Sequence, residues 1–349
     1  MTQEPIPHWP GQLIDLGDHQ VFVRSVPAED HAEGHDENHD EGHDEDPDED
    51  HGAEPALCVH GLAGSSRNWT DLMDLLRPRL ACAALDLPGF GDSPPRPDGR
   101  YSIAALAQTV AALIERNQIE RNQIERNQKR PVHLIANSLG GAVSVRLAAT
   151  RPDLVQTLTL ISPALPDSRP RLDLVRFPVM SLPRLGSRLL RKYQTLPPQA
   201  RVADVITTCY ADPALFPPAR FNAEVTELAR RDTLDYATDA MVGSIRALTA
   251  EAFRAGRHAA WRDAARITVP TLVIYGSHDR LVLPRMAGRA AQAFSGARIV
   301  VLPRTGHVAH MEHPARVAAE IGVLLEGIPA RADRLTVARA GQQAATPVR

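Results

Sequence analysis

A serine flanked by small residues stands between a predicted strand and a predicted helix. The segment reads Ala136-Asn137-Ser138-Leu139-Gly140-Gly141. A nucleophile presented at such a turn has a strained backbone, so its neighbours must be small, as Ala136 and Gly140 are. The helix that begins at Ser138 also directs free N–H groups and its positive dipole end toward any oxyanion formed there. Serine is equally a common helix N-cap, so the segment indicates catalysis only if partners exist.

A nucleophilic serine needs a base, and the base needs an acid that orients it. Asp279 follows a predicted strand that ends in Gly276, and His307 follows the last predicted strand of the chain. All three side chains therefore come just after the carboxyl end of a strand, where open α/β sheets place their sites. This order predicts Ser138 as nucleophile, His307 as base and Asp279 as orienting acid.

Other residues compete for two of these roles. His310 and His313 compete for the base, although both lie further into the loop that contains His307. Asp167 competes for the acid, because it also comes after a predicted strand.

A second loop could complete an oxyanion hole. Residues 60–64 read His-Gly-Leu-Ala-Gly and follow a short apolar run. The glycines allow close backbone approach, so we expect the N–H groups of Leu62 and Leu139 to hold a carbonyl oxygen together.

The elements that must position these residues are apolar strands alternating with helices. Two short strands with a turn at Gly17-Asp18 are expected within residues 1–28. The strands of the core are expected within residues 53–166 and 267–327. This pattern predicts an α/β fold with a mostly parallel central sheet and helices on both faces.

A long interval separates the two parts of the expected core. Residues 167–266 contain amphipathic stretches and many prolines, and 100 residues are too many for a bare loop. We therefore expect a helical cap inserted into the sheet. Residues 328–349 are expected to form a flexible tail.

Residues 29–52 are strongly acidic and rich in histidine. They hold 13 carboxylates and no Lys or Arg; without them the chain has 29 acids, 39 bases and a net charge of +10. Such a composition cannot bury a core, so we expect a disordered loop. Its histidines at four-residue spacing could bind Zn, Ni or Cu, but weak adventitious affinity is the favoured interpretation, and we expect no cofactor and no dedicated metal site. These histidines are His31, His35, His39 and His43.

The pentapeptide Ile-Glu-Arg-Asn-Gln occurs three times in residues 114–128. A period of five cannot keep the isoleucines on one helix face, and three copies are too few for a solenoid. We interpret the repeat as a surface segment that lengthens a helix.

Five motifs in order along the chain resemble the α/β-hydrolase fold serine hydrolases of esterase and lipase type. They are His60-Gly61-Leu62-Ala63-Gly64-Ser65, Asp86-Leu87-Pro88-Gly89-Phe90-Gly91-Asp92-Ser93, the turn at Ser138, Gly276-Ser277-His278-Asp279, and Gly306-His307-Val308-Ala309-His310-Met311-Glu312-His313-Pro314. The resemblance implies the same triad of Ser138, His307 and Asp279. Haloalkane dehalogenases and epoxide hydrolases of this fold carry an aspartate where Ser138 stands, so the resemblance excludes them.

The expected reaction is hydrolysis of a carboxylic ester through an acyl-enzyme. Asn137 and the paired glycines after Ser138 also resemble C–C bond hydrolases of the meta-cleavage type, which remain an alternative. A non-enzymatic metal-binding or interaction protein on a hydrolase scaffold is the third possibility. We expect a small-molecule substrate and no nucleic acid partner, and the sequence leaves the oligomeric state open.

Basic and apolar residues are interleaved between Arg171 and Lys192. A solvated basic face over packed apolar residues is the favoured interpretation, and contact with a membrane surface is the alternative. Three cysteines in 349 residues indicate a reducing compartment, so we expect a cytoplasmic protein.

Overall fold

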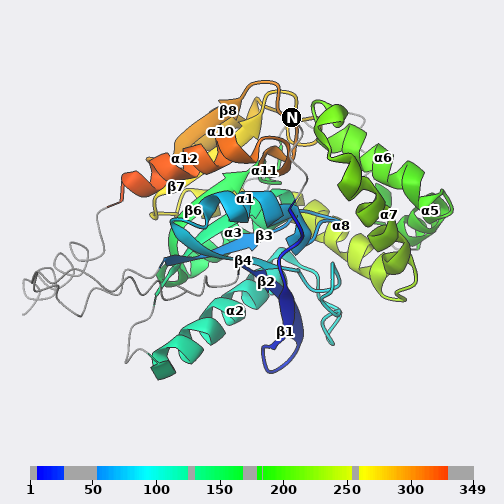
Figure 1. Cartoon of the computed structure of the whole chain (residues 1–349), viewed down its shortest axis with the longest axis horizontal. Helices are drawn as coiled ribbons and strands as arrows, with labels where there is room; N and C mark the ends of the chain where they lie inside the picture. Colours follow the sequence, from blue (N-terminus) through cyan, green and yellow to red (C-terminus); the bar gives the residue numbers. More distant parts are fainter. Residues whose placement is uncertain are drawn as a thin grey trace, which may run out of the picture.

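An eight-stranded sheet forms the centre of the computed structural model, which describes residues 6–26, 53–124, 130–167, 179–182, 184–253 and 259–328 (Figure 1). The strand order is β1-β2-β4-β3-β5-β6-β7-β8. Strands β3 to β8 run parallel to one another. Strand β2 pairs antiparallel with β4, and β1 pairs antiparallel with β2 at the edge of the sheet. The strands are β1 Gly11–Asp15, β2 Gln20–Ser25, β3 Glu54–Val59, β4 Leu80–Leu85, β5 Val132–Asn137, β6 Val155–Ile161, β7 Thr271–Gly276 and β8 Arg298–Leu302.

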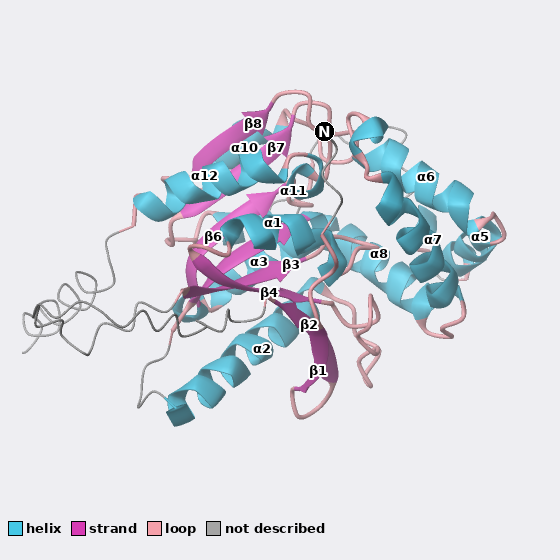
Figure 2. Ribbon diagram, in the orientation of Figure 1, coloured by secondary structure: helices cyan, strands magenta, loops and turns pink. Residues whose placement is uncertain are grey.

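Helices cover both faces of the sheet (Figure 2). One apolar cluster joins the sheet to α2, α3, α9 and α10, and a second joins its other face to α1 and α12. The helices are α1 Thr70–Leu76, α2 Ile103–Ile124, α3 Ser138–Thr150, α5 Leu185–Gln194, α6 Pro198–Cys209, α7 Pro218–Asp232, α8 Ala237–Phe253, α9 Ala259–Ala264, α10 Met286–Ala293, α11 Ala309–Glu312 and α12 Pro314–Glu326, with short 3-10 helices η1 Ser66–Trp69, η2 Pro152–Leu154 and η4 Pro213–Leu215. The predicted fold class is confirmed.

The central strands are buried along their whole length because both faces of the sheet are covered. All six residues of β5 and all six of β7 are buried. This burial is why the parallel strands are continuous apolar runs in the sequence instead of alternating patterns.

Helices α5 to α8 come between β6 and β7 in the sequence. They stand together beside one end of the strands (Figure 1). They belong to what we call the β6–β7 insertion, residues 167–266. Gly89, in the loop after β4, has a φ of +80°, and a Cβ there would lie 2.6 Å from the Cβ of Ala240 in α8. The Arg231 guanidinium of α7 donates to the Gly89 carbonyl at 3.3 Å. The insertion therefore packs on the loop that follows the carboxyl end of β4.

The described residues that flank the acidic segment lie toward the opposite end of the strands, where the parallel strands begin. Strand β2 ends at Ser25 beside Ala83, and β3 begins at Glu54 beside Leu80, the first residue of β4. The tract itself, including its four histidines, lies outside the described residues, as does the tail after Ile328.

Helix α2 runs from Ile103 to Ile124 and so includes residues 114–124 of the pentapeptide repeat. This agrees with the interpretation that the repeat lengthens a helix. Within the described ranges, no helix is both long and apolar enough to cross a membrane.

Deletion of residues Asp30 to Asp50 is expected to leave turnover almost unchanged. The described residues that flank the segment lie at the amino ends of the parallel strands, whereas Ser138 follows the carboxyl end of β5, and a change in the length of a long connection costs little free energy. The measurement is kcat and KM of the deletion variant beside the full chain, without added metal. A tenfold fall in kcat at saturating substrate would contradict this placement.

Candidate active site

Ser138 stands in left-handed backbone geometry at the junction of β5 and α3. Its φ is +51°, and β5 ends at Asn137, so no loop residue separates the strand from the helix. A Cβ at Gly140 would lie 2.3 Å from the carbonyl oxygen of Val59 and 2.6 Å from that of His60. Only glycine therefore permits this approach of α3 to the end of β3. The packing holds the serine in a conformation that a non-glycine residue rarely adopts.

Asp279 and His307 form a hydrogen-bonded pair in the buried interior. His307 Nδ1 lies 2.9 Å from Asp279 Oδ2, and Asp279 Oδ1 accepts the N–H groups of Leu281 and Val282 at 2.8 and 2.9 Å. Burial alone would raise the pKa of Asp279, but the His307 charge and these hydrogen bonds hold it below its ordinary value. An ionised carboxylate only accepts hydrogen bonds, so the Nδ1 atom of His307 carries the proton. The Nε2 atom of His307 is then available to take up and release a proton.

Asn137 ties the serine turn to the histidine loop. Its side-chain amide donates to the backbone carbonyls of Ile161 at 3.0 Å and His307 at 3.1 Å. A Cβ at Gly61 would lie 3.0 Å from the Cβ of Ser138. The loops after β3, β5 and β8 therefore meet at one place. In the sequence, Asn137 indicates only a resemblance to C–C hydrolases, because this structural link has no local sequence signal.

His60 fixes the loop that contains Leu62. The Leu87 N–H donates to His60 Nε2 at 2.9 Å, so Nδ1 carries the proton and donates to the Gly61 carbonyl at 2.7 Å. Burial lowers the pKa of His60, which keeps the ring neutral and this arrangement intact. Leu139 is buried behind Ser138, and Leu62 packs on the same apolar cluster.

His310 is engaged elsewhere. Its ring stacks on Trp69 with the centroids 4.2 Å apart and the planes 26° from parallel. Burial, followed by the charge of His307, lowers the pKa of His310 to about 3. His310 therefore acts as a neutral packing residue beneath the site.

The remaining competitors have partners of their own. His313 Nε2 lies 3.3 Å from the carbonyl of Arg304. Asp167 pairs with the Arg285 guanidinium at 2.6 Å. These contacts favour His307 over His313 and Asp279 over Asp167.

The Asp86 carboxylate organises the loop between β4 and α2. It accepts the N–H of Ser66 at 2.5 Å and the N–H of Asp92 at 2.8 Å. Gly91 has a φ of +53°, and a Cβ there would lie 2.2 Å from Asp86 Oδ2. This motif therefore has a structural function, because it holds the start of η1 and the loop under the insertion.

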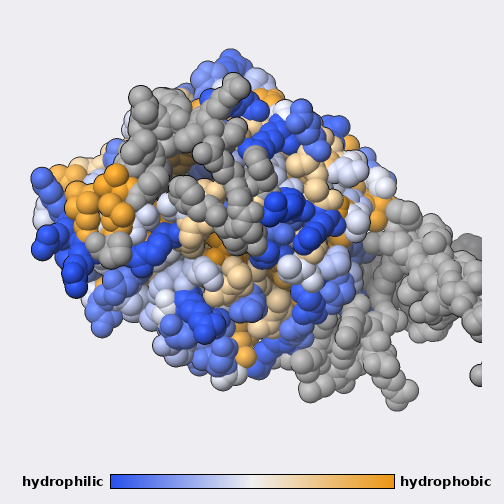
Figure 3. All heavy atoms as spheres, turned by 180° about the vertical axis from the view of Figure 1, so that it is seen from behind, coloured by the Kyte–Doolittle hydropathy of each residue, from blue (hydrophilic) through white to orange (hydrophobic). Residues whose placement is uncertain are grey.

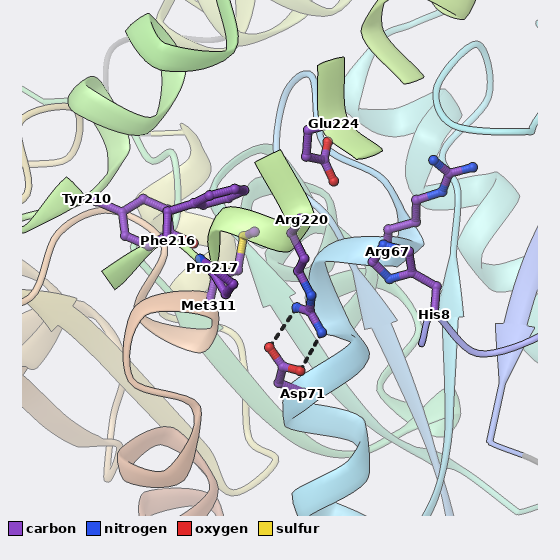
Figure 4. A pocket seen from close by; sticks show the side chains of 9 residues that line it. All are labelled: His8, Arg67, Asp71, Tyr210, Phe216, Pro217, Arg220, Glu224 and Met311. Carbon is purple, nitrogen blue, oxygen red and sulfur yellow. Dashed lines mark hydrogen bonds and ion pairs between the residues drawn. The ribbon is translucent and has the colours of Figure 1, made fainter. Parts of the chain in front are cut away.

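A small pocket lies where α1, the N-terminal segment and the insertion meet (Figure 4). Its residues are His8, Arg67, Asp71, Tyr210, Phe216, Pro217, Arg220, Glu224 and Met311. Both guanidinium nitrogens of Arg220 bind the Asp71 carboxylate, at 2.6 and 2.7 Å, and Arg67 pairs with Glu227 at 3.2 Å. Because these cations are neutralised by carboxylates, we interpret the pocket as a joint between α1 and the insertion.

No group of three or more metal-ligating side chains gathers among the described residues.

Three curated proteins show how this chain relates to known ones. A pimeloyl-[acyl-carrier protein] methyl ester esterase of Neisseria meningitidis serogroup B is 28% identical over 280 residues, covering 77% of this chain and 92% of that protein. The dihydrolipoyllysine-residue acetyltransferase component of the acetoin cleaving system of Cupriavidus necator is 28% identical over 263 residues, covering 75% of this chain. The chain spans only 60% of that protein's length. A 2-hydroxy-6-oxononadienedioate/2-hydroxy-6-oxononatrienedioate hydrolase of Cupriavidus pinatubonensis is 25% identical over 267 residues, covering 75% of this chain and 83% of that protein.

The sequence profile of the Alpha/beta hydrolase family matches residues 56–320, which is most of the chain. The matched range begins in β3 and ends in α12, so it contains β4 to β8, most of β3, and Ser138, Asp279 and His307. The match and the sheet topology agree: this chain belongs to the α/β-hydrolase family and is a hydrolase-type enzyme.

Proposed function

We propose that the chain is a serine hydrolase that cleaves a carboxylic ester, with Ser138 as nucleophile, His307 as base and Asp279 as orienting acid. The observation that carries the proposal is the buried Asp279–His307 hydrogen bond, in a loop that Asn137 ties to the strained Ser138 turn. The positions of these three residues after β5, β7 and β8 support the same assignment.

In the proposed mechanism, His307 Nε2 takes the proton of the Ser138 hydroxyl as its oxygen attacks the ester carbonyl. Ionised Asp279 holds the imidazole in the required tautomer and stabilises the imidazolium that forms. The N–H groups of Leu62 and Leu139 stabilise the oxyanion. Return of the proton to the alcohol releases it, and a water molecule then hydrolyses the acyl-enzyme by the same steps.

An ester is the favoured substrate class because of the Neisseria meningitidis relative, whose name states a methyl ester esterase and whose length this chain nearly spans. We infer an ester of a carboxylic acid as substrate. Assays with p-nitrophenyl esters of increasing acyl length test this inference and give the preferred chain length.

C–C bond hydrolysis is the second candidate. The Cupriavidus pinatubonensis relative is named as a hydrolase of that kind, and Asn137 with the paired glycines resembles the same subfamily. Incubation with a dienoic diketone acid distinguishes the two, because a C–C hydrolase turns it over faster than any simple ester. A non-enzymatic metal-binding or interaction protein on a hydrolase scaffold would react with neither substrate and would not be labelled by a fluorophosphonate.

Ser138→Ala is expected to abolish ester hydrolysis and fluorophosphonate labelling while the fold stays intact. Loss of a triad serine lowers turnover by as much as ~10⁶ in a well-studied protease. Ser144→Ala is the matched control, because Ser144 lies in the same helix, is buried, and its hydroxyl bonds to no described residue. Circular dichroism checks the fold of both variants. Esterase activity that persists in Ser138→Ala would refute the assignment.

Asp279→Asn is expected to lower kcat by about 10⁴, the effect of the corresponding change in a serine protease, because an amide no longer holds the required imidazole tautomer. Asp167→Asn should have little effect, since Asp167 pairs with the partly exposed Arg285 guanidinium and not with His307 in the contacts described above. The measurement is kcat of both variants at saturating ester. If Asp167→Asn is the crippling change, the acid has been placed on the wrong strand.

Helix α5 presents apolar and basic side chains to solvent together. Leu185 and Leu189 lie one turn apart on α5 and are 41% and 39% exposed, and Leu182, just before the helix, is 48% exposed. Among the described leucines of this segment, Leu190 alone packs inward as the solvated-face interpretation requires. Figure 3 shows an apolar patch bordered by hydrophilic atoms at the end of the molecule that carries α5. The exposed basic residues of this helix and its N-cap are Arg184, Arg188, Arg191 and Lys192. We therefore also propose that α5 contacts anionic lipid surfaces.

The full chain is expected to cosediment with anionic vesicles at low salt and not with neutral ones. Binding should weaken toward physiological ionic strength, where the Debye length falls to about 8 Å. Leu189→Ser should weaken it, whereas the control Leu215→Ser, a 44% exposed leucine in η4, should not. Equal and negligible binding to both vesicle types would leave the solvated-face interpretation standing.

A further inference from the structure

A buried carboxylate connects the histidine loop to the β6–β7 insertion. Glu312, the last residue of α11, is only 6% exposed. Its Oε2 accepts the N–H of Gly306 at 2.6 Å. Its Oε1 accepts the N–H groups of Ala211 and Asp212 at 3.0 and 3.2 Å. The two oxygens thus face two different segments, one before His307 and one between α6 and η4.

The same two segments also touch directly. The His307 N–H donates to the Cys209 carbonyl at 2.6 Å. A Cβ at Gly306 would lie 2.3 Å from that carbonyl oxygen and 2.6 Å from the nitrogen of Ala211. The backbone that leads into His307, at Gly306 and at the His307 N–H, is therefore held against residues 209–212 of the insertion.

The chemistry of this link requires a carboxylate. Each oxygen of Glu312 accepts and neither donates, which matches three N–H groups arriving from two sides. A glutamine has one accepting oxygen and one donating NH₂ group, so it would place a donor against an N–H on one side. A buried N–H group without an acceptor is costly, so the loop or the insertion must then shift.

We propose that Glu312 is a positioning residue that fixes His307 against Ser138 by locking its loop to residues 209–212 of the insertion. This inference rests on the proposed function, because it takes His307 as the base. Residues 209–212 of the insertion, which lie 95 to 98 residues before His307 in sequence, would then help to hold the catalytic base in place. The three hydrogen bonds that define this link run from backbone N–H groups to the Glu312 carboxylate, and none of them involves Asp279 or the His307 imidazole.

The test compares Glu312→Gln with Glu320→Gln in the full chain. Glu320 pairs with Arg298 on the surface of α12, so it supplies the same substitution outside the link. We expect Glu312→Gln to lower kcat for a short p-nitrophenyl ester by about 10²-fold, the effect of a small misplacement of a reacting group. KM should stay within a factor of two. The downfield proton NMR signal of His307 Nδ1–H, whose loss in Asp279→Asn identifies it, should shift or broaden. Glu320→Gln should change none of these quantities.

Wild-type kcat and an unchanged downfield signal in folded Glu312→Gln would overturn the proposal, as would a rise in KM with kcat preserved. If Glu312→Gln does not fold, Glu312→Asp keeps the charge but shortens the reach. It is then expected to lower kcat with KM preserved, and wild-type kcat in that variant would overturn the proposal equally. The NMR signal reports on His307 without turnover, so it distinguishes failure of this inference from failure of the proposed function, which Ser138→Ala tests.

Discussion

The left-handed backbone at Ser138 is the constraint on which the rest of the site depends. It persists because α3 approaches the end of β3 so closely that Gly140 has no room for a side chain beside the Val59 and His60 carbonyls. That approach requires β3 and β5 to be neighbours in register, as the pairing of Val59 with Ala136 shows. The sheet order therefore determines the serine geometry, and the serine geometry in turn requires glycine two residues later.

Buried polar side chains that bind backbone groups connect the loops at the carboxyl edge of the sheet. His60 joins the loops after β3 and β4, and Asp86 joins the latter loop to η1. Asn137 joins the ends of β5 and β6 to the loop after β8, and Glu312 joins that loop to the insertion. Because a buried polar group is costly without its partner, each link also fixes the spacing of the strand ends.

The sequence predicted the strands and layers well, since a strand buried on both faces is a continuous apolar run that local pattern identifies. It also placed Ser138, Asp279 and His307 after strands, and the structure pairs the last two. The hydrogen bonds of Asn137 and Glu312 could not be predicted, because they span 170 and 101 residues and depend on tertiary packing. For the same reason the sequence left two interpretations of the segment that contains α5: periodicity shows that a helix has an apolar face but not where it points.

The position of β8 has a consequence for synthesis on the ribosome. It is the outermost strand of the parallel series and the last to emerge, and Gly306 and His307 follow it. Strands β3 and β5, which constrain Ser138, are complete more than 160 residues earlier. Since the chain folds as it emerges, a nascent chain can hold the strained serine before it holds the histidine. The proposed triad would thus be completed only after β8 and the loop that follows it have emerged.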